Sequence, residues 1–164
     1  MPDLQQSQLV ILIAVSSAII LIAAWGFELI GGYSPCPLCL MQRYAYYFAV
    51  PAALAAIFLM SLNKVKLAKL VLVLIGLSFV INASLGIYHS GVEWHWWHGP
   101  SSCVSSSADF ASDASDILKK LQTSKAIRCD EAQWRLFGLS FAGYNVIFSL
   151  ILVALTFKVI KAKS

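Results

Sequence analysis

Four long stretches without a charged residue limit what this chain of 164 residues can fold into. Each is long enough to form a helix that crosses the hydrocarbon core of a membrane, which needs about 20 residues. A soluble helical bundle would show polar stripes along its helices, whereas these stretches are apolar nearly all round. The hydrophobic share of 59% also exceeds the roughly 45 to 50% of soluble domains. The stretches are residues 4–27, 44–63, 70–92 and 136–157.

We therefore predict an all-α fold, an integral membrane four-helix bundle forming a single domain over residues 1–164. The transmembrane helices are expected at about 8–29, 43–62, 68–89 and 137–158, joined on one side of the membrane by loops at about 30–42 and 90–136. The first helix is expected to be retained. No Lys or Arg precedes it, and it exceeds the usual apolar length of a signal peptide, about 7 to 15 residues.

Lysines gather in two segments that contain no acidic residue, one after the second apolar stretch and one after the fourth. They are Lys64, Lys66 and Lys69, then Lys158, Lys161 and Lys163. Short cytoplasmic segments collect positive charge, so both segments and both chain ends are predicted to be cytoplasmic. The net charge of +4 is then explained by topology and by contact with anionic lipid, and a nucleic-acid partner is not expected.

All four cysteines fall in the two loops predicted to lie on the far side of the membrane from the cytoplasm: Cys36, Cys39, Cys103 and Cys129. Disulfides persist in oxidising compartments on that side. An even number of cysteines confined to one side indicates disulfide chemistry, although four cysteines permit three pairings.

Cys36 and Cys39 form a Cys-x-x-Cys pair, which can close a disulfide, bind a soft metal or exchange electrons as a dithiol. Pro37 suits the first turn of a helix, which would place Cys39 near the positive end of the helix dipole and lower its thiol pKa. Arg43, one turn further on, would favour the thiolate of Cys39 and could hold an anionic or carbonyl-bearing ligand. The alternative role for Arg43 is that of an interfacial anchor.

The third apolar stretch ends in a segment that contains all three histidines of the chain. His89 is placed to reach the membrane edge near Arg43, where it could bind a ligand or donate a proton. His95 and His98 alternate with tryptophans and are expected to be interfacial side chains, so no metal site is predicted.

Other polar and small residues have expected structural roles. Asn82 should pair with a neighbouring helix, and Gly138, Ser140 and Gly143 should allow close helix packing. Residues 110–121 carry apolar side chains at helical spacing and predict a short amphipathic helix in the second outer loop.

Several motifs follow one another in a fixed order along almost the whole chain. They are Pro35-Cys36-Pro37-Leu38-Cys39 with Gln42-Arg43, Tyr88-His89-Ser90-Gly91-Val92-Glu93, Gly99-Pro100-Ser101-Ser102-Cys103, and Cys129 with Trp134, Phe137-Gly138-Leu139-Ser140 and Gly143-Tyr144-Asn145. In these motifs the chain resembles the DsbB disulfide-bond-formation proteins of bacterial inner membranes. The resemblance implies a quinone-dependent oxidase that regenerates the disulfide of DsbA, a soluble thioredoxin-like protein.

The resemblance also implies a role for each site residue. The partner's thiolate attacks a Cys103–Cys129 disulfide, with Cys103 forming the mixed disulfide, and the resulting dithiol is reoxidised by a Cys36–Cys39 disulfide. Cys39 then passes the electrons to ubiquinone or menaquinone. Arg43 steadies the negative charge that develops on the quinone oxygen, and His89 borders the quinone head.

Three alternatives remain at this point. A metal or iron–sulfur site with four cysteine ligands is disfavoured by the long gap between Cys103 and Cys129. A non-enzymatic membrane protein with two structural disulfides leaves Arg43 beside the cysteine pair unexplained. A relative that serves a dedicated partner in place of a general DsbA is also compatible with the sequence.

Overall fold

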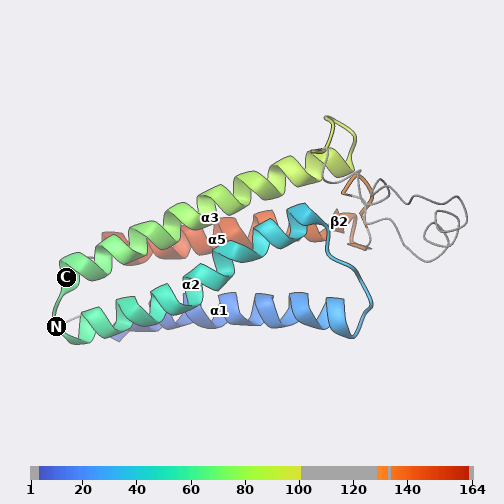
Figure 1. Cartoon of the computed structure of the whole chain (residues 1–164). Helices are drawn as coiled ribbons and strands as arrows, with labels where there is room; N and C mark the ends of the chain where they lie inside the picture. Colours follow the sequence, from blue (N-terminus) through green and yellow to red (C-terminus); the bar gives the residue numbers. More distant parts are fainter. Residues whose placement is uncertain (1–3, 101–128, 133, 163–164) are drawn as a thin grey trace, which may run out of the picture.

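The structure, a computed structural model, describes residues 4–100, 129–132 and 134–162. Four long apolar helices pack as a bundle: α1 (Leu4–Leu29), α2 (Pro37–Ser61), α3 (Val65–Glu93) and α5 (Phe141–Lys161) (Figure 1). Each is long and apolar enough to cross a membrane. The all-α fold predicted from the sequence is confirmed, and the chain is a multi-pass membrane protein with four candidate spans.

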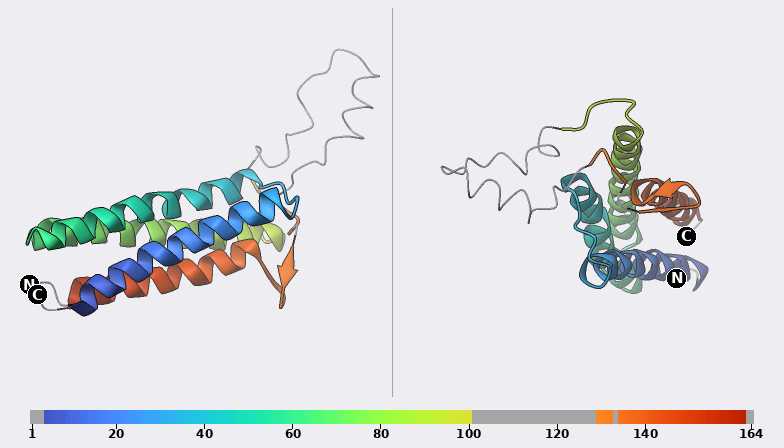
Figure 2. Two further views of the ribbon diagram at one scale, coloured as in Figure 1. Left: turned by 90° about the horizontal axis from the view of Figure 1, so that it is seen from below. Right: turned by 90° about the vertical axis from the view of Figure 1, so that its right-hand side faces the viewer.

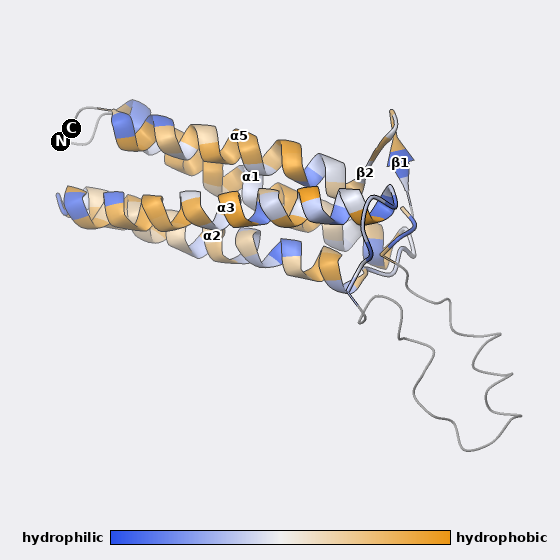
Figure 3. Ribbon diagram, turned by 90° about the horizontal axis from the view of Figure 1, so that it is seen from above, coloured by the Kyte–Doolittle hydropathy of each residue, from blue (hydrophilic) through white to orange (hydrophobic). Residues whose placement is uncertain are grey.

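The helices form a ring in the order α1, α2, α3, α5, seen from the end in Figure 2. Contacts between α1 and α5 are much sparser than those between the other neighbours in the ring. Apolar residues continue around the outer faces of the helices, and hydrophilic residues gather toward the ends of the bundle (Figure 3). Exposed side chains such as Ile22, Phe58 and Ile81 fit a surface that meets lipid.

Helix α2 begins at Pro37, earlier than the span predicted at about residue 43. Pro37 occupies the first turn, where its missing N–H costs nothing. Cys36 caps the helix, because its Sγ accepts a hydrogen bond from the backbone N–H of Cys39 at 3.2 Å. The short outer loop therefore ends at Cys36, and Cys39 lies on the helix. Helix α3 likewise extends past the predicted limits of 68–89 at both ends.

Helix α5 begins at Phe141, four residues after the start predicted near residue 137. The preceding residues turn back as a small antiparallel pair, β1 (Arg135–Leu136) and β2 (Leu139–Ser140). Phe137 and Gly138 have positive φ angles of 50° and 83°, a conformation suited to a tight turn. Ser140 then caps α5, accepting a hydrogen bond from the N–H of Gly143 at 3.3 Å.

A polar network ties three helices together inside the apolar bundle, and it confirms that Asn82 pairs with a neighbouring helix. Asn82 Nδ2 donates to Asn145 Oδ1 and to Ser149 Oγ, both at 3.0 Å. The Tyr46 hydroxyl on α2 donates to Asn145 Oδ1 at 2.7 Å. Such bonds satisfy polar groups that could find no water in a membrane.

The close helix packing predicted at Gly138, Ser140 and Gly143 is found elsewhere, at Gly86 of α3. A Cβ atom at Gly86 would lie only 2.7 Å from Val146 Cγ2 of α5, so any larger residue there would separate α3 from α5. Gly138 and Ser140 belong to the turn and the helix cap instead. The predicted amphipathic helix at 110–121 lies outside the described residues.

Candidate active site

The start of α2 brings the sulfur atoms of Cys36 and Cys39 to 2.8 Å from each other. Both residues are free thiols. Cys36 is only 2% exposed, and Cys39 is partly buried one helical turn further on. Because one residue caps the helix and the other lies in its first turn, the local fold alone places the two sulfurs side by side. The structure therefore presents a reduced dithiol.

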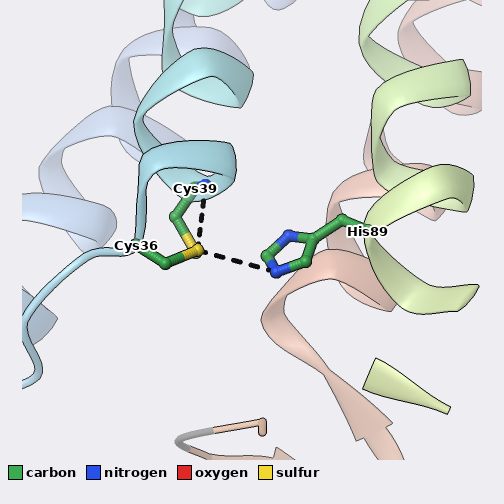
Figure 4. A group of neighbouring side chains, drawn as sticks. All are labelled: Cys36, Cys39 and His89. Carbon is green, nitrogen blue, oxygen red and sulfur yellow. Dashed lines mark hydrogen bonds between the residues drawn. The ribbon is translucent and has the colours of Figure 1, made fainter. Parts of the chain in front are cut away.

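His89 of α3 points its ring at this pair across the bundle (Figure 4). Its Nε2 lies 3.6 Å from Cys36 Sγ, and its Nδ1 lies 2.9 Å from Gln42 Nε2. The contact with Gln42 holds the ring in this orientation, with Nε2 as the nitrogen that faces the sulfur. The sequence placed His89 near Arg43, whereas the structure brings it to the cysteine pair itself.

Two residues of this cluster were missed in the sequence analysis, Gln42 and Glu93. Gln42 is 6% exposed, and Glu93, one turn after His89, is 7% exposed. Glu93 Oε1 lies 3.7 Å from His89 Nε2. Both residues belong to the quoted motifs. Their spacing, three residues from Cys39 and four from His89, was the available signal that they share a helix face with these site residues.

The pKa of Cys36 is lowered to about 5, well below the usual thiol value of about 8.5. The largest cause is the hydrogen bond with the Cys39 thiol. The His89 ring and the backbone N–H of Cys39 act in the same direction, and burial opposes them. The sequence predicts the favoured thiolate at Cys39, whereas in this arrangement Cys36 Sγ is the sulfur that accepts the backbone N–H of Cys39 and faces His89.

A spectroscopic pH titration tests this arrangement. In the reduced Cys103→Ser/Cys129→Ser protein, the ultraviolet absorbance of the Cys36 thiolate should persist as the pH falls and disappear around pH 5, because protonation occurs only near the lowered pKa. The matching Cys36→Ser variant supplies the baseline. Cys39→Ala should raise the midpoint, since it removes the hydrogen bond that contributes most to the lowered pKa of Cys36. A parent midpoint near the usual thiol value of about 8.5 would contradict the assignment.

Arg43 is paired with an acidic residue that the sequence analysis did not consider. Its Nη1 donates to Glu28 Oε2 of α1 at 2.6 Å, and Nη2 reaches the Ala24 carbonyl at 3.5 Å. The two side chains are 13% and 28% exposed. Glu28 is the only acidic residue between Asp3 and Glu93, and this isolation already indicates it as the partner of Arg43. Arg43 is thus held against α1, partly out of water.

A cavity of about 630 Å³ is lined mainly by residues of α1 and α5, together with residues of α2 and α3 at the outer end of the bundle. Its walls are mainly apolar, with aromatic rings from Phe27, Trp134 and Phe141, and Trp134 and Phe141 are stacked at 4.9 Å. The polar residues on its wall include those of the cysteine cluster: Cys36, Cys39, Gln42, Arg43, His89 and Glu93. A cavity of this size and character is typical of a small-molecule site.

Cys129 lies beside the first cysteine pair. It is 1% exposed and belongs to the same buried cluster as Cys36, Leu38 and Val92. It is disulfide-bonded. Cys103 lies outside the described residues. His95 and His98 are exposed and take no part in the cysteine cluster.

Comparison with known proteins places these features in a family. The family model described as disulfide bond formation protein DsbB matches residues 6–159. An uncharacterized protein of Rickettsia prowazekii (strain Madrid E) is 30% identical over 139 residues, which cover 84% of this chain and 77% of that protein. With a family match over nearly its whole length, the chain belongs to the DsbB family of disulfide bond formation proteins.

Proposed function

We propose that this protein is a membrane disulfide oxidase, which reoxidises a DsbA-like periplasmic protein of thioredoxin fold and passes the electrons to a membrane quinone. Membership of the DsbB family implies a role in disulfide bond formation. The observation that supports the finer proposal is the shared cavity: a cysteine pair, Arg43 and His89 line one apolar chamber between two membrane helices.

The residues around the cavity fit a quinone. A quinone has a flat polar head and an apolar tail, and it accepts two electrons and two protons when it is reduced. The cavity offers aromatic and aliphatic walls for such a molecule, and its sparse α1 to α5 side suits a lipid-soluble one. Arg43 would hold the head by its oxygen, and His89 would border it.

Electrons reach the cavity through two thiol exchanges in this proposal. The reduced partner attacks a Cys103–Cys129 disulfide, first forming a mixed disulfide with Cys103, and leaves these two cysteines as thiols. They in turn reduce a Cys36–Cys39 disulfide and become a disulfide again. Burial of Cys129 in the same cluster as Cys36 supports a short path for the second exchange. The Cys36 and Cys39 dithiol is the form that reduces the quinone.

The protein contributes three effects to this last step. Cys36 and Cys39 lose two electrons as their disulfide forms, with Cys39 taken as the sulfur that faces the quinone. The His89 ring, 3.6 Å from Cys36 Sγ, is placed to stabilise the Cys36 thiolate by a hydrogen bond. The Arg43 guanidinium opposes the negative charge that develops on the quinone oxygen.

The two other classes of function fit the structure less well. A metal site built from all four cysteines would need Cys129 as a thiolate, but Cys129 is disulfide-bonded. A purely structural role for Cys36 and Cys39 does not explain why they lie on the cavity wall together with His89 and Arg43.

A turnover assay tests the proposal directly. The purified protein in detergent is given a quinone and a reduced thioredoxin-fold dithiol protein, and quinone reduction is followed by absorbance. We expect quinone consumption equal to the number of disulfides formed in the partner, because each disulfide releases two electrons. Absence of quinone reduction while the partner is oxidised by oxygen alone would refute the proposed acceptor.

The orientation of the bundle is tested by thiol labelling. A reagent that cannot cross the membrane should label Cys103 in intact spheroplasts after mild reduction, because the lysine segments predict cytoplasmic chain ends and outer cysteine loops. A cysteine introduced at Ser61, at the opposite end of α2, serves as the control and should be labelled only after lysis. The reverse pattern would invert the predicted topology.

A further inference from the structure

Three metal-binding side chains converge at the start of α2. The ligand atoms of Cys36, Cys39 and His89 all lie within 4.8 Å of one another. Two thiolates and an imidazole form a donor set that suits Zn²⁺ and chemically similar cations, and it is a poor one for Mg²⁺ or Ca²⁺. The group needs one more ligand to complete a tetrahedral site.

Glu93 brings a carboxylate next to His89, just outside this group of three. Its Oε1 lies 3.7 Å from His89 Nε2, and the residue is more than nine-tenths buried. Its Oε2 is buried and makes no hydrogen bond within the part of the chain that the structure describes. A buried carboxylate oxygen without a partner is costly, and a bound cation would relieve that cost.

Among the three convergent ligands the distances require little rearrangement, and the Glu93 carboxylate has to move toward the two sulfurs to complete the site. In a tetrahedral zinc site a sulfur and a nitrogen ligand are about 3.5 Å apart and two sulfurs about 3.8 Å apart. Cys36 Sγ and His89 Nε2 already lie 3.6 Å apart. The two sulfurs, now 2.8 Å apart, would have to separate by about 1 Å. All four residues line the cavity between α1 and α5, which gives a cation a way in.

We propose that Cys36, Cys39, His89 and Glu93 form a Zn²⁺ site that exists only while the cysteine pair is reduced. Binding releases into solvent any proton that either sulfur still carries and leaves two zinc-bound thiolates, with no change in oxidation state. A Cys36–Cys39 disulfide has no thiolate to offer, so oxidation abolishes the site. Resting on the proposed function, a further consequence is that bound Zn²⁺ withholds the dithiol from quinone and inhibits turnover.

The binding test uses the Cys103→Ser/Cys129→Ser protein, so that only the first cysteine pair can contribute thiolates. The reduced protein in detergent is titrated anaerobically with Zn²⁺ in competition with a coloured zinc indicator. We expect one Zn²⁺ per reduced protein and none after the pair is oxidised. His89→Ala and Glu93→Gln should each weaken binding at least about tenfold, since even a residue that only supports a ligand contributes roughly that much. Mg²⁺ should not compete.

His98→Ala is the matched control, because His98 is an exposed histidine outside the cysteine cluster, and its zinc affinity should equal that of the parent. Equal affinity in the parent and in His89→Ala would mean that the two thiols alone chelate zinc, and it would overturn the site. Binding to the oxidised protein would also overturn it. Because these titrations contain no quinone, their outcome is independent of the proposed function, and the inhibition of turnover is measured separately.

Discussion

Replacing Cys39 by serine is expected to lower quinone reduction by at least about a thousandfold, the scale seen when a covalent step loses its reacting group. Serine has nearly the size of cysteine and can still cap or hydrogen-bond, but it cannot form the disulfide whose closure releases the electrons. Cys36→Ser, Cys103→Ser and Cys129→Ser should each stop turnover for the same reason, at different steps of the relay.

The step at which electron transfer is blocked distinguishes these variants. With Cys39→Ser, one round of partner oxidation at the second cysteine pair should still occur, while quinone reduction should not. With Cys103→Ser, even that single round should fail. Ser61→Ala, at the far end of the same helix, is the control and should keep activity within about twofold, as surface substitutions usually do. Full quinone reduction by Cys39→Ser would refute the relay.

The sequence predicted the bundle well because the membrane imposes a simple length rule on helices. The ends of the helices are set by capping and turn residues, which a hydropathy pattern does not detect. Pro37 and the Cys36 cap start α2 early, and the turn at Phe137 and Gly138 starts α5 late. These few residues decide that Cys39 lies on the first turn of a helix and not in a free loop.

The site was predictable where its members share one helix or motif, and less so where they meet across helices. Cys36, Cys39, Arg43 and His89 all line one cavity, and their roles there stay predictions. The partner of Arg43 is Glu28 on another helix, and no spacing rule links residues on different helices. The cavity itself depends on the sparse packing of α1 against α5, a tertiary feature that a single sequence does not report.

The preference for a thiolate at Cys39 rests on helix position alone. The helix dipole acts on both residues at the start of α2. Only the folded geometry reveals that Cys36 Sγ receives the Cys39 N–H and faces His89 across the bundle. These contacts across helices are what the spacing of residues along one helix does not reveal.

Replacing Arg43 by alanine is expected to raise the KM for quinone about tenfold, close to the value of one charge-assisted hydrogen bond. The KM for the protein partner should change much less, because Arg43 lines the cavity and is only 13% exposed. The two constants are measured by varying one substrate while the other is saturating. Equal changes in both would indicate that Arg43 is only an anchor.

The ion pair with Glu28 makes a sharper version of this test possible. In Arg43→Ala the Glu28 carboxylate loses its partner at 2.6 Å and leaves a negative charge near the place where quinone must gain electrons. Part of the damage should therefore come from Glu28, and Arg43→Ala/Glu28→Ala should recover some quinone affinity relative to Arg43→Ala alone. Glu28→Ala by itself keeps the guanidinium and should have the smallest effect. If the loss of quinone affinity in the double variant equals the sum of the losses in the two single variants, Glu28 and Arg43 do not act as a pair. In that case Glu28 on α1 has no influence on how Arg43 acts at the cavity.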